Sequence, residues 1–256
     1  MAELRRLLIG SRRLEKLHSS DKTLMLNSNE VHYLSRVLRL RTGDQFAVVD
    51  GLGHLWKAHL CDKGLIRLSS SFACPVEEKS RPHPLIGLAI AVPKRGFEEV
   101  LRMSCEIGVD IVQPLSSERS VVRVEGESKS IRWSGIVREA IEQSERLWSP
   151  EFRSIIDVKD WLIHRPEKSA FAFASTRMLN SNEFQLWMNE MNQQIDQLWI
   201  AIGPEGGWTN QERVLAKKVG CVEVQFGDSI LRTATAAVAA TELMVSWRRN
   251  RSIYMQ

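Results

Sequence analysis

Long apolar runs are missing from this sequence. No stretch approaches the roughly 20 consecutive apolar residues that span a bilayer. The first 17 residues contain several basic side chains but neither an extended apolar core nor a small-residue cleavage site. We therefore expect a soluble, cytoplasmic protein without a membrane partner.

Cysteine is also scarce. The four cysteines, Cys61, Cys74, Cys105 and Cys221, lie far apart and form no CxxC pair. No histidine stands close enough to them to complete a zinc pattern. We interpret them as reduced, mostly buried thiols and expect no bound metal.

The motifs of several common catalytic sites are absent as well. The sequence contains no HExxH, no convincing nucleophile with a base, and no obvious pair of carboxylates of the glycosidase type. An enzyme with this sequence would depend on positioning its reactants rather than on covalent chemistry. Apolar residues make up 43% of the chain, which is enough for a folded core.

Positive charge is present but unevenly distributed. Residues 1–80 hold 13 of the 35 Lys and Arg and 9 of the 31 Asp and Glu, and the remaining residues hold 22 of each kind. The whole net charge of +4 therefore lies in the first third. This is typical of a polyanion-binding module joined to a neutral one. A solvated basic face without a partner is the alternative that charge alone leaves open.

Residues 1–75 have the pattern of short strands and turns. The sequence Asp-Gly-Leu-Gly at 50–53 interrupts two strand-like runs and predicts a hairpin. Residues 27–44 predict a short helix capped by Asn27 or Ser28. We expect a small β-barrel. Arginine suits phosphate groups and stacking on bases, and the candidates for binding RNA here are Arg5, Arg6, Arg36, Arg39 and Arg41.

The pattern changes after a proline-rich linker at residues 76–84. From residue 85 to residue 256, continuous apolar runs such as LIGLAIAV alternate with helical patterns. This alternation predicts an α/β domain with a mostly parallel sheet. Within it, Arg138, Glu142 and Glu145 have helical spacing, and we interpret them as an ion-pair ladder on one helix face.

Two glycine-containing loops follow predicted strands. In IGPEGGWTNQE, three glycines free the backbone, and Thr209 and Glu212 have the spacing of a capping box at a helix start. The stretch fits neither GxxxxGK[ST] nor GxGxxG. In VQFGDSILRTATAA, Arg232 and Thr233 again stand at a helix start. Because ligands bind beyond the carboxyl ends of parallel strands, both are candidate ligand loops. Ordinary strand-to-helix turns remain the alternative.

Taken together, these residues resemble the RsmE-type 16S ribosomal RNA uridine-N3 methyltransferases of the SPOUT class. The stretches that carry the resemblance are HYLSRVLRLRTGD, GVDIVQPLSSERSVV, REAIEQSERLWSPE, IGPEGGWTNQE and ILRTATAA. They occur in the family's order over nearly the whole chain. Three positions depart from the family's usual residues, with Ala234 in place of Glu, Ser229 in place of Arg, and Trp208 in place of Phe.

The resemblance implies a PUA-like β-barrel followed by an α/β domain with a deep trefoil knot. It implies S-adenosylmethionine (SAM) as the cofactor, a homodimer, and methylation of N3 of one uridine in 16S rRNA of the small ribosomal subunit. With the bounds given by the sequence pattern above, the barrel takes residues 1–75, the linker 76–84 and the methyltransferase domain 85–256. The residues that it implies for cofactor binding are Ala174, Ile202, Gly203, Pro204, Glu205, Gly206, Gly207, Phe226, Gly227, Ile230, Leu231, Arg232, Thr233 and Thr235.

The implied reaction is direct transfer of a methyl group from a sulfonium to N3 of uracil. Arg119 and Arg138 are candidates for stabilising negative charge on the uracil oxygens. Glu205 is a candidate proton acceptor, although a role in holding its loop together is favoured. Two alternatives stay open: another SPOUT methyltransferase acting on tRNA or a ribose 2′-hydroxyl, and an RNA-binding assembly factor without catalytic activity.

Overall fold

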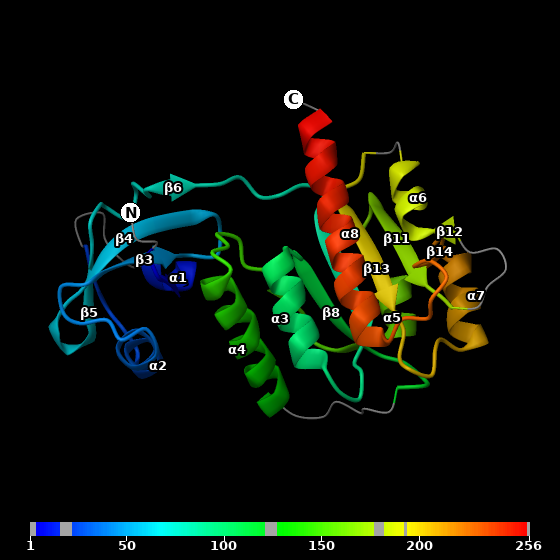
Figure 1. The fold of residues 1–256 in the computed structure, drawn as a ribbon, viewed down its shortest axis with the longest axis horizontal. Helices are drawn as coiled ribbons and strands as arrows, with labels where there is room; N and C mark the ends of the chain where they lie inside the picture. Colours follow the sequence, from blue (N-terminus) through cyan, green and yellow to red (C-terminus); the bar gives the residue numbers. More distant parts are fainter. Residues whose placement is uncertain (1–3, 16–21, 121–126, 177–181, 192–193, 255–256) are drawn as a thin grey trace. The chain divides into compact units, whose positions relative to one another are not determined.

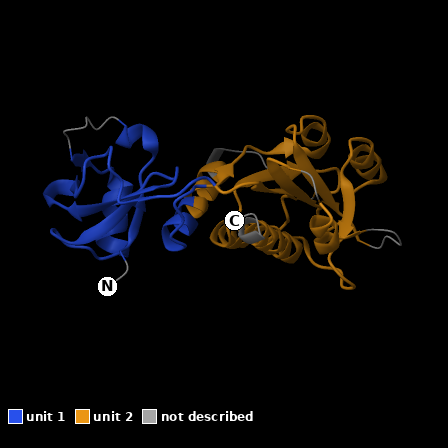
Figure 2. Ribbon diagram, turned by 90° about the horizontal axis from the view of Figure 1, so that it is seen from above, with its two compact units in different colours: residues 1–81, 138–149 blue, residues 82–137, 150–256 orange. Residues whose placement is uncertain are grey.

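The chain folds into two compact units, shown in blue and orange in Figure 2. The computed structural model describes residues 4–15, 22–120, 127–176, 182–191 and 194–254. Unit 1 comprises residues 1–81 and 138–149, and unit 2 comprises residues 82–137 and 150–256. The sequence analysis placed residues 138–149 in the C-terminal domain, so the division into units does not follow a single cut in the chain.

Unit 1 contains a six-stranded sheet in which all pairs except β1–β3 are antiparallel. Its strands are β1 (Arg6–Leu8), β2 (Thr23–Met25), β3 (Gln45–Val49), β4 (His54–Leu60), β5 (Leu65–Leu68) and β6 (Glu77–Glu78). The hairpin predicted at residues 50–53 joins β3 to β4. Strand β6 pairs with β4, so part of the segment predicted as a linker belongs to this sheet.

The helical segment of unit 1 begins where the sequence predicted. Helix α2 (Ser28–His32) starts at a capping box in which the Asn27 side chain accepts from Glu30 N and the Glu30 carboxylate accepts from Asn27 N. A π-helix, η1 (Tyr33–Val37), continues it, and Leu34 points into the apolar core. Unit 1 also contains α1 (Ser11–Leu14) and a 3-10 turn, η2 (Asp62–Gly64).

Unit 2 is built on an eight-stranded sheet in which every pair is parallel, as predicted. Its main path runs β10-β8-β7-β13-β11-β14-β12. The strands are β7 (Leu85–Ala91), β8 (Ile111–Ser116), β9 (Glu151–Phe152), β10 (Ile156–Asp157), β11 (Ser169–Ala174), β12 (Asn182–Glu183), β13 (Gln197–Ile202) and β14 (Val222–Gln225).

Helices cover both faces of this sheet (Figure 1). The helices of the described chain after residue 85 are α3 (Phe97–Ile107), α4 (Glu127–Gln143), α5 (Val158–Ile163), α6 (Phe184–Asn189), α7 (Asn210–Lys218) and α8 (Thr233–Tyr254), and α3, α5, α6, α7 and α8 contact the sheet or one another. Helices α3 and α8 pack together across β7 and β13. Helices α5 and α7 share a core cluster with alternate residues of the same strands, so they lie on the opposite face. Helix α4 starts in unit 2 and ends in unit 1.

Close packing fixes the centre of the sheet and the C-terminal helix. The Trp199 indole lies against Gly87, where a Cβ atom would come within 2.3 Å of the ring, so only glycine fits at that position. Arg248 on α8 forms a buried ion pair with Asp110, and the Asp110 carboxylate also accepts from Ile86 N at 2.8 Å. The ion pair therefore ties α8 to β7. The threading expected for a trefoil knot stays a prediction.

Candidate functional site

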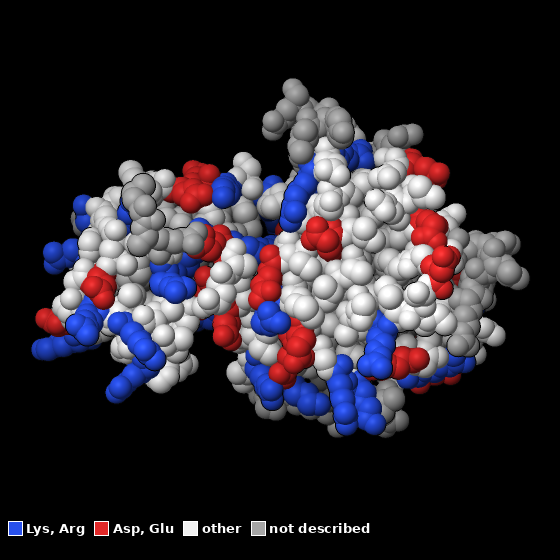
Figure 3. Space-filling view, in the orientation of Figure 1, with Lys and Arg blue, Asp and Glu red and all other residues white. Residues whose placement is uncertain are grey.

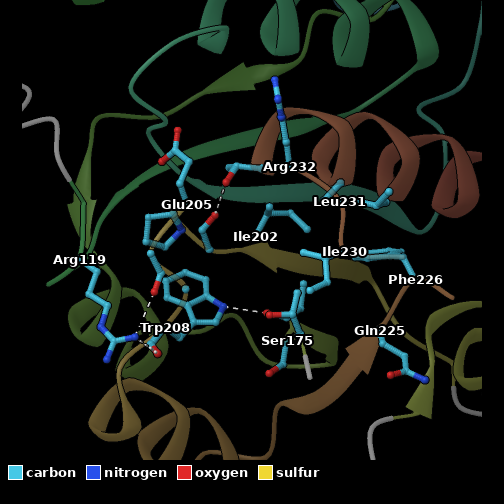
Figure 4. A pocket seen from close by; sticks show the side chains of 18 of the residues that line it. Arg119, Ser175, Ile202, Glu205, Trp208, Gln225, Phe226, Ile230, Leu231 and Arg232 are labelled. Carbon is cyan, nitrogen blue, oxygen red and sulfur yellow. Dashed lines mark hydrogen bonds between the residues drawn. The ribbon is translucent and has the colours of Figure 1, made fainter. Parts of the chain in front are cut away.

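A large pocket lies at one edge of the unit 2 sheet. Because β11, β13 and β14 are parallel, their carboxyl ends meet at this edge, and the loops that follow them form the pocket walls. The cavity has a volume of about 960 Å³. Figure 4 shows Phe226, Ile230 and Leu231 along one side of it and Arg119 and Trp208 on the other.

The pocket brings together nearly all of the residues predicted to bind a cofactor. Those that line it are Ala174, Ile202, Gly203, Pro204, Glu205, Gly206, Gly207, Phe226, Gly227, Ile230, Leu231, Arg232 and Thr233. Thr235 is exposed on the first turn of α8 and is not among the lining residues. Whether each of these residues contacts a cofactor stays a prediction.

Residues 203–208, called here the central loop, are hydrogen bonded to two neighbouring segments of the pocket wall. The Trp208 indole is stacked on Phe173 at 4.4 Å between ring centroids, and its Nε1 donates to Ala174 O at 2.9 Å. The Thr233 hydroxyl donates to Gly203 O at 2.9 Å. The end of β11 and the start of α8 are thus fixed to the same loop.

Two predicted catalytic residues also take part in holding the central loop. The Glu205 carboxylate accepts from Lys94 N at 3.1 Å, which ties the loop to the segment after β7. Arg119 Nη1 donates to Gly206 O at 3.0 Å and lies 3.5 Å from Trp208 O. Each of the two side chains therefore makes a hydrogen bond that holds the central loop in place. For Glu205, this contact favours the loop-holding role over proton transfer.

Buried or partly buried carboxylates fix the remaining loops. The Glu212 side chain is fully buried and accepts from Thr209 N at 2.7 Å and from Glu118 N at 3.1 Å. The Glu183 carboxylate accepts from Gly227 N at 3.1 Å and from the Gln225 side chain at 2.9 Å. The first holds the helix start after the central loop, and the second holds the loop after β14.

Two glycines of the pocket have backbone conformations that favour glycine. Gly207 has φ +67° and Gly227 has φ +74°, and a Cβ atom built on either would have no neighbour within 4 Å. Other residues rarely adopt such angles. The Cα atoms at both positions therefore border open space, while both N–H groups are already bonded, Gly207 N to Pro204 O at 2.8 Å and Gly227 N to the Glu183 carboxylate.

Arg138, the third predicted catalytic residue, lies in unit 1 and not among the residues that line the pocket. Its guanidinium donates to Leu8 O at 2.7 Å and to the Glu142 carboxylate at 3.2 Å. Glu142 in turn accepts from Leu8 N at 2.9 Å. Burial raises the pKa of Glu142, although the Leu8 N–H and Arg138 act in the opposite direction. Arg138 and Glu142 together therefore hydrogen bond both backbone groups of Leu8, which lies on the edge strand β1.

The five N-terminal arginines predicted to bind RNA differ in how far their side chains are buried and hydrogen bonded. Arg6 donates to the backbone carbonyl and the carboxylate of Glu145, and its side chain is 14% exposed. The other four predicted RNA-binding residues are exposed, namely Arg5, Arg36, Arg39 and Arg41. Figure 3 shows Lys and Arg side chains projecting over and around α2 in the left-hand unit.

The sequence analysis missed several pocket residues. They are Ser175, Thr176, Trp208, Asn210, Arg213, Gln225, Asp228, Ser229 and Ala236. Ser175 and Thr176 directly follow β11 at the same sheet edge, a position that could have identified them. The inclusion of Arg213 and Asn210 depends on how α7 packs, for which the sequence carries no signal.

The described residues contain no group of three or more His, Cys, Asp or Glu side chains that could hold a metal ion. Cys105 and Cys221 are buried, whereas Cys61 is half-buried and Cys74 is exposed, so the expectation of mostly buried thiols fits two of the four. Burial raises the pKa of Cys221 to about 11, which keeps that thiol protonated at neutral pH. In the part of the chain that the structure covers, no helix is both long and apolar enough to cross a membrane.

Comparisons with known proteins agree across the chain. A family model described as an RNA methyltransferase domain matches residues 80–245, and one described as an RNA methyltransferase PUA domain matches residues 26–67. The ribosomal RNA small subunit methyltransferase E of Synechocystis sp. is 38% identical over 223 residues, which cover 86% of this chain and 72% of that protein. The protein of the same name from Rickettsia conorii is 28% identical, with coverages of 88% and 90%.

A solved structure is similar over almost the whole chain. It is the ribosomal RNA small subunit methyltransferase E of Neisseria gonorrhoeae bound to S-adenosyl methionine, with 28% sequence identity and a TM-score of 0.79. The match covers 95% of this chain and 98% of that one.

Proposed function

The chain belongs to the ribosomal RNA small subunit methyltransferase E family, and from this premise we propose that it transfers a methyl group from SAM to N3 of one uridine in 16S rRNA. The observation that carries this proposal is the pocket at the sheet edge, where the IGPEGGW and ILRT loops come together. We assign the small ribosomal subunit as the partner, a homodimer as the active form, and the cytoplasm as its place of action.

The pocket residues fit SAM in size and chemistry. A cavity of about 960 Å³ is within the range of small-molecule sites. Ile230 is 59% exposed at the pocket wall and offers an apolar surface to a ring, while Gly207 and Gly227 carry no side chain that would fill the space beside them. When bound, SAM supplies a methyl group activated by its sulfonium. The chain's own contribution is to hold the donor and the acceptor in line.

The residues near the pocket take distinct roles in this proposal. Arg119 lines the pocket rim, and in the described part of the chain its Nε and Nη2 make no hydrogen bond. These groups can stabilise negative charge that develops on the uracil oxygens when N3 loses its proton. Glu205 holds the central loop through Lys94 N. Arg138 stabilises unit 1 through Leu8 and Glu142.

Unit 1 provides the RNA-binding surface. The matching PUA-domain model covers residues 26–67, which include the exposed side chains of Arg36, Arg39 and Arg41. Exposed guanidinium groups bind phosphates without reading sequence. The choice of a single uridine therefore depends on the shape of the subunit RNA around it, and the target base must be exposed or flipped before it can react.

A methylation assay tests the proposal. Small ribosomal subunits from cells lacking the native enzyme are incubated with the protein and labelled SAM, and the product nucleoside is mapped by mass spectrometry. We expect N3-methyluridine at one position. Label in tRNA or on a ribose 2′-hydroxyl would contradict the substrate. Loss of both label and SAM binding would favour the inactive assembly factor.

Paired variants test the pocket itself. Arg232 is exposed at the pocket wall, whereas Arg249 is exposed near the other end of α8 and is not among the lining residues. Arg232→Ala is expected to weaken SAM binding at least tenfold in a calorimetric titration, and Arg249→Ala is expected to leave it unchanged. Equal affinities in the two variants would remove Arg232 from the binding site.

A further inference from the structure

Glu212 makes one hydrogen bond more than a helix cap requires. Its Oε2 accepts from Thr209 N and, with the Thr209 hydroxyl, completes the capping box of α7. Its Oε1 accepts from Glu118 N at 3.1 Å, in a segment 94 residues earlier in the chain. The side chain is 0% exposed, the bond to Thr209 N is buried, and the bond to Glu118 N is partly buried. Both bonds to the carboxylate are charge-assisted.

The Glu118 bond lies next to a residue of the pocket. Glu118 and Arg119 occupy the middle of a turn in which Ser120 N donates to Ser117 O at 3.0 Å. Arg119 then reaches the central loop, where Nη1 donates to Gly206 O. The turn is thus attached at two points. The Glu118 N–H binds the Glu212 carboxylate, and the Arg119 side chain binds Gly206 O in the central loop.

We propose that Glu212 is a positioning residue for methyl transfer, which acts through the Glu118 N–H to aim the Arg119 guanidinium at the target base. This inference rests on the proposed function. A buried carboxylate is costly unless its hydrogen bonds are made, so it holds both N–H groups firmly in place. Displacement of a reacting partner by about 1 Å can lower the rate of an enzyme about 100-fold, so a firm attachment of Arg119 matters for turnover.

The variant Glu212→Gln separates the two bonds. The amide oxygen can keep the shorter bond to Thr209 N, and the amide NH₂ then faces Glu118 N, donor against donor. Thr209→Ala is the matched control. It removes the hydroxyl from the same helix cap and keeps both bonds of Glu212, and Thr209 is not among the residues that line the pocket. Both variants are expected to lower the melting temperature by similar amounts.

Turnover distinguishes positioning from capping. Glu212→Gln is expected to lower kcat at least tenfold and to change the SAM Kd by less than threefold, while Thr209→Ala keeps kcat within twofold of the starting protein. In an Arg119→Ala background, Glu212→Gln is expected to lower kcat by less than a further threefold, because the group that it positions is gone. Equal kcat in Glu212→Gln and Thr209→Ala, or a full tenfold effect without Arg119, would overturn the proposal.

A second variant tests the same bond from the donor side. Glu118 is the second residue of its turn, a position where proline is favoured, so Glu118→Pro removes the N–H and suits the turn. It is expected to reproduce the loss of kcat, and unchanged turnover would overturn the proposal. Amide exchange of Glu118 in the SAM-free protein gives a readout independent of activity. We expect it to be at least tenfold faster in Glu212→Gln, and an equal rate would refute the attachment even if no methylation were detected.

Discussion

Replacing Trp208 with phenylalanine removes one hydrogen bond from the pocket and keeps the aromatic packing. The indole is 6% exposed and stacked on Phe173, and its Nε1 donates to Ala174 O at 2.9 Å. A net hydrogen bond is worth about 1 kcal/mol. If that bond keeps the central loop in the form that binds SAM, its loss lowers the population of that form by up to about fivefold, and the apparent SAM Kd rises by the same factor.

Trp247 provides the matched control for this variant. Its Nε1 also donates to a carbonyl, Met188 O, at 2.9 Å, and it is 9% exposed but not among the pocket residues. Trp247→Phe is therefore expected to lower the free energy of unfolding by about 1 kcal/mol, as Trp208→Phe does, and to leave the SAM Kd unchanged. Calorimetric titration with SAM and urea unfolding measure the two quantities. An unchanged Kd in Trp208→Phe, with the expected loss of stability, would refute the reasoning.

Three further predictions follow from contacts described above. Thr233→Val keeps the side-chain shape but removes the hydroxyl that donates to the central loop, and should raise the SAM Kd about fivefold by titration. Because burial raises the folded-state pKa of Glu142, protonation favours the folded state. At pH 7, Glu142→Gln should therefore have a larger free energy of unfolding than the starting protein. The difference should become smaller as the pH falls toward the ordinary glutamate pKa, because the starting protein gains stability when Glu142 takes up a proton. A difference that does not change with pH would contradict this. Arg36→Ala with Arg39→Ala should flatten the salt dependence of RNA affinity by about 1.4 in log–log slope if each contacts one phosphate, and an unaltered slope would place the RNA elsewhere.

The elements that position the pocket could be predicted because their sequence signals are local. LIGLAIA and QLWIAI are continuous apolar runs, and each forms a strand buried on both faces. Parallel strands place their carboxyl ends at one edge, so the loops at Gly203 and Gly227 could be expected to meet. The start of α7 was also readable, since Thr209 and Glu212 are three residues apart.

The contacts that assign roles to single side chains could not be predicted in the same way. Arg138 and Glu142 have the spacing of a helical ion pair, and that pair is present. Their partner Leu8, however, is about 130 residues away, and sequence spacing says nothing about such distant contacts. The short strands β9, β10 and β12 escaped prediction because two residues are too few to show a period.

Unit 1 depends on a segment that is synthesised late. Translation proceeds from the N-terminus, so residues 1–81 leave the ribosome long before residues 138–149, which belong to the same unit. Until Arg138 and Glu142 emerge, the Leu8 N–H and C=O on strand β1 lack the side chains that satisfy them. The nascent chain therefore carries an open strand edge while β7 and β8 are being made, and the N-terminal module completes its folding only after more than half of the polypeptide exists.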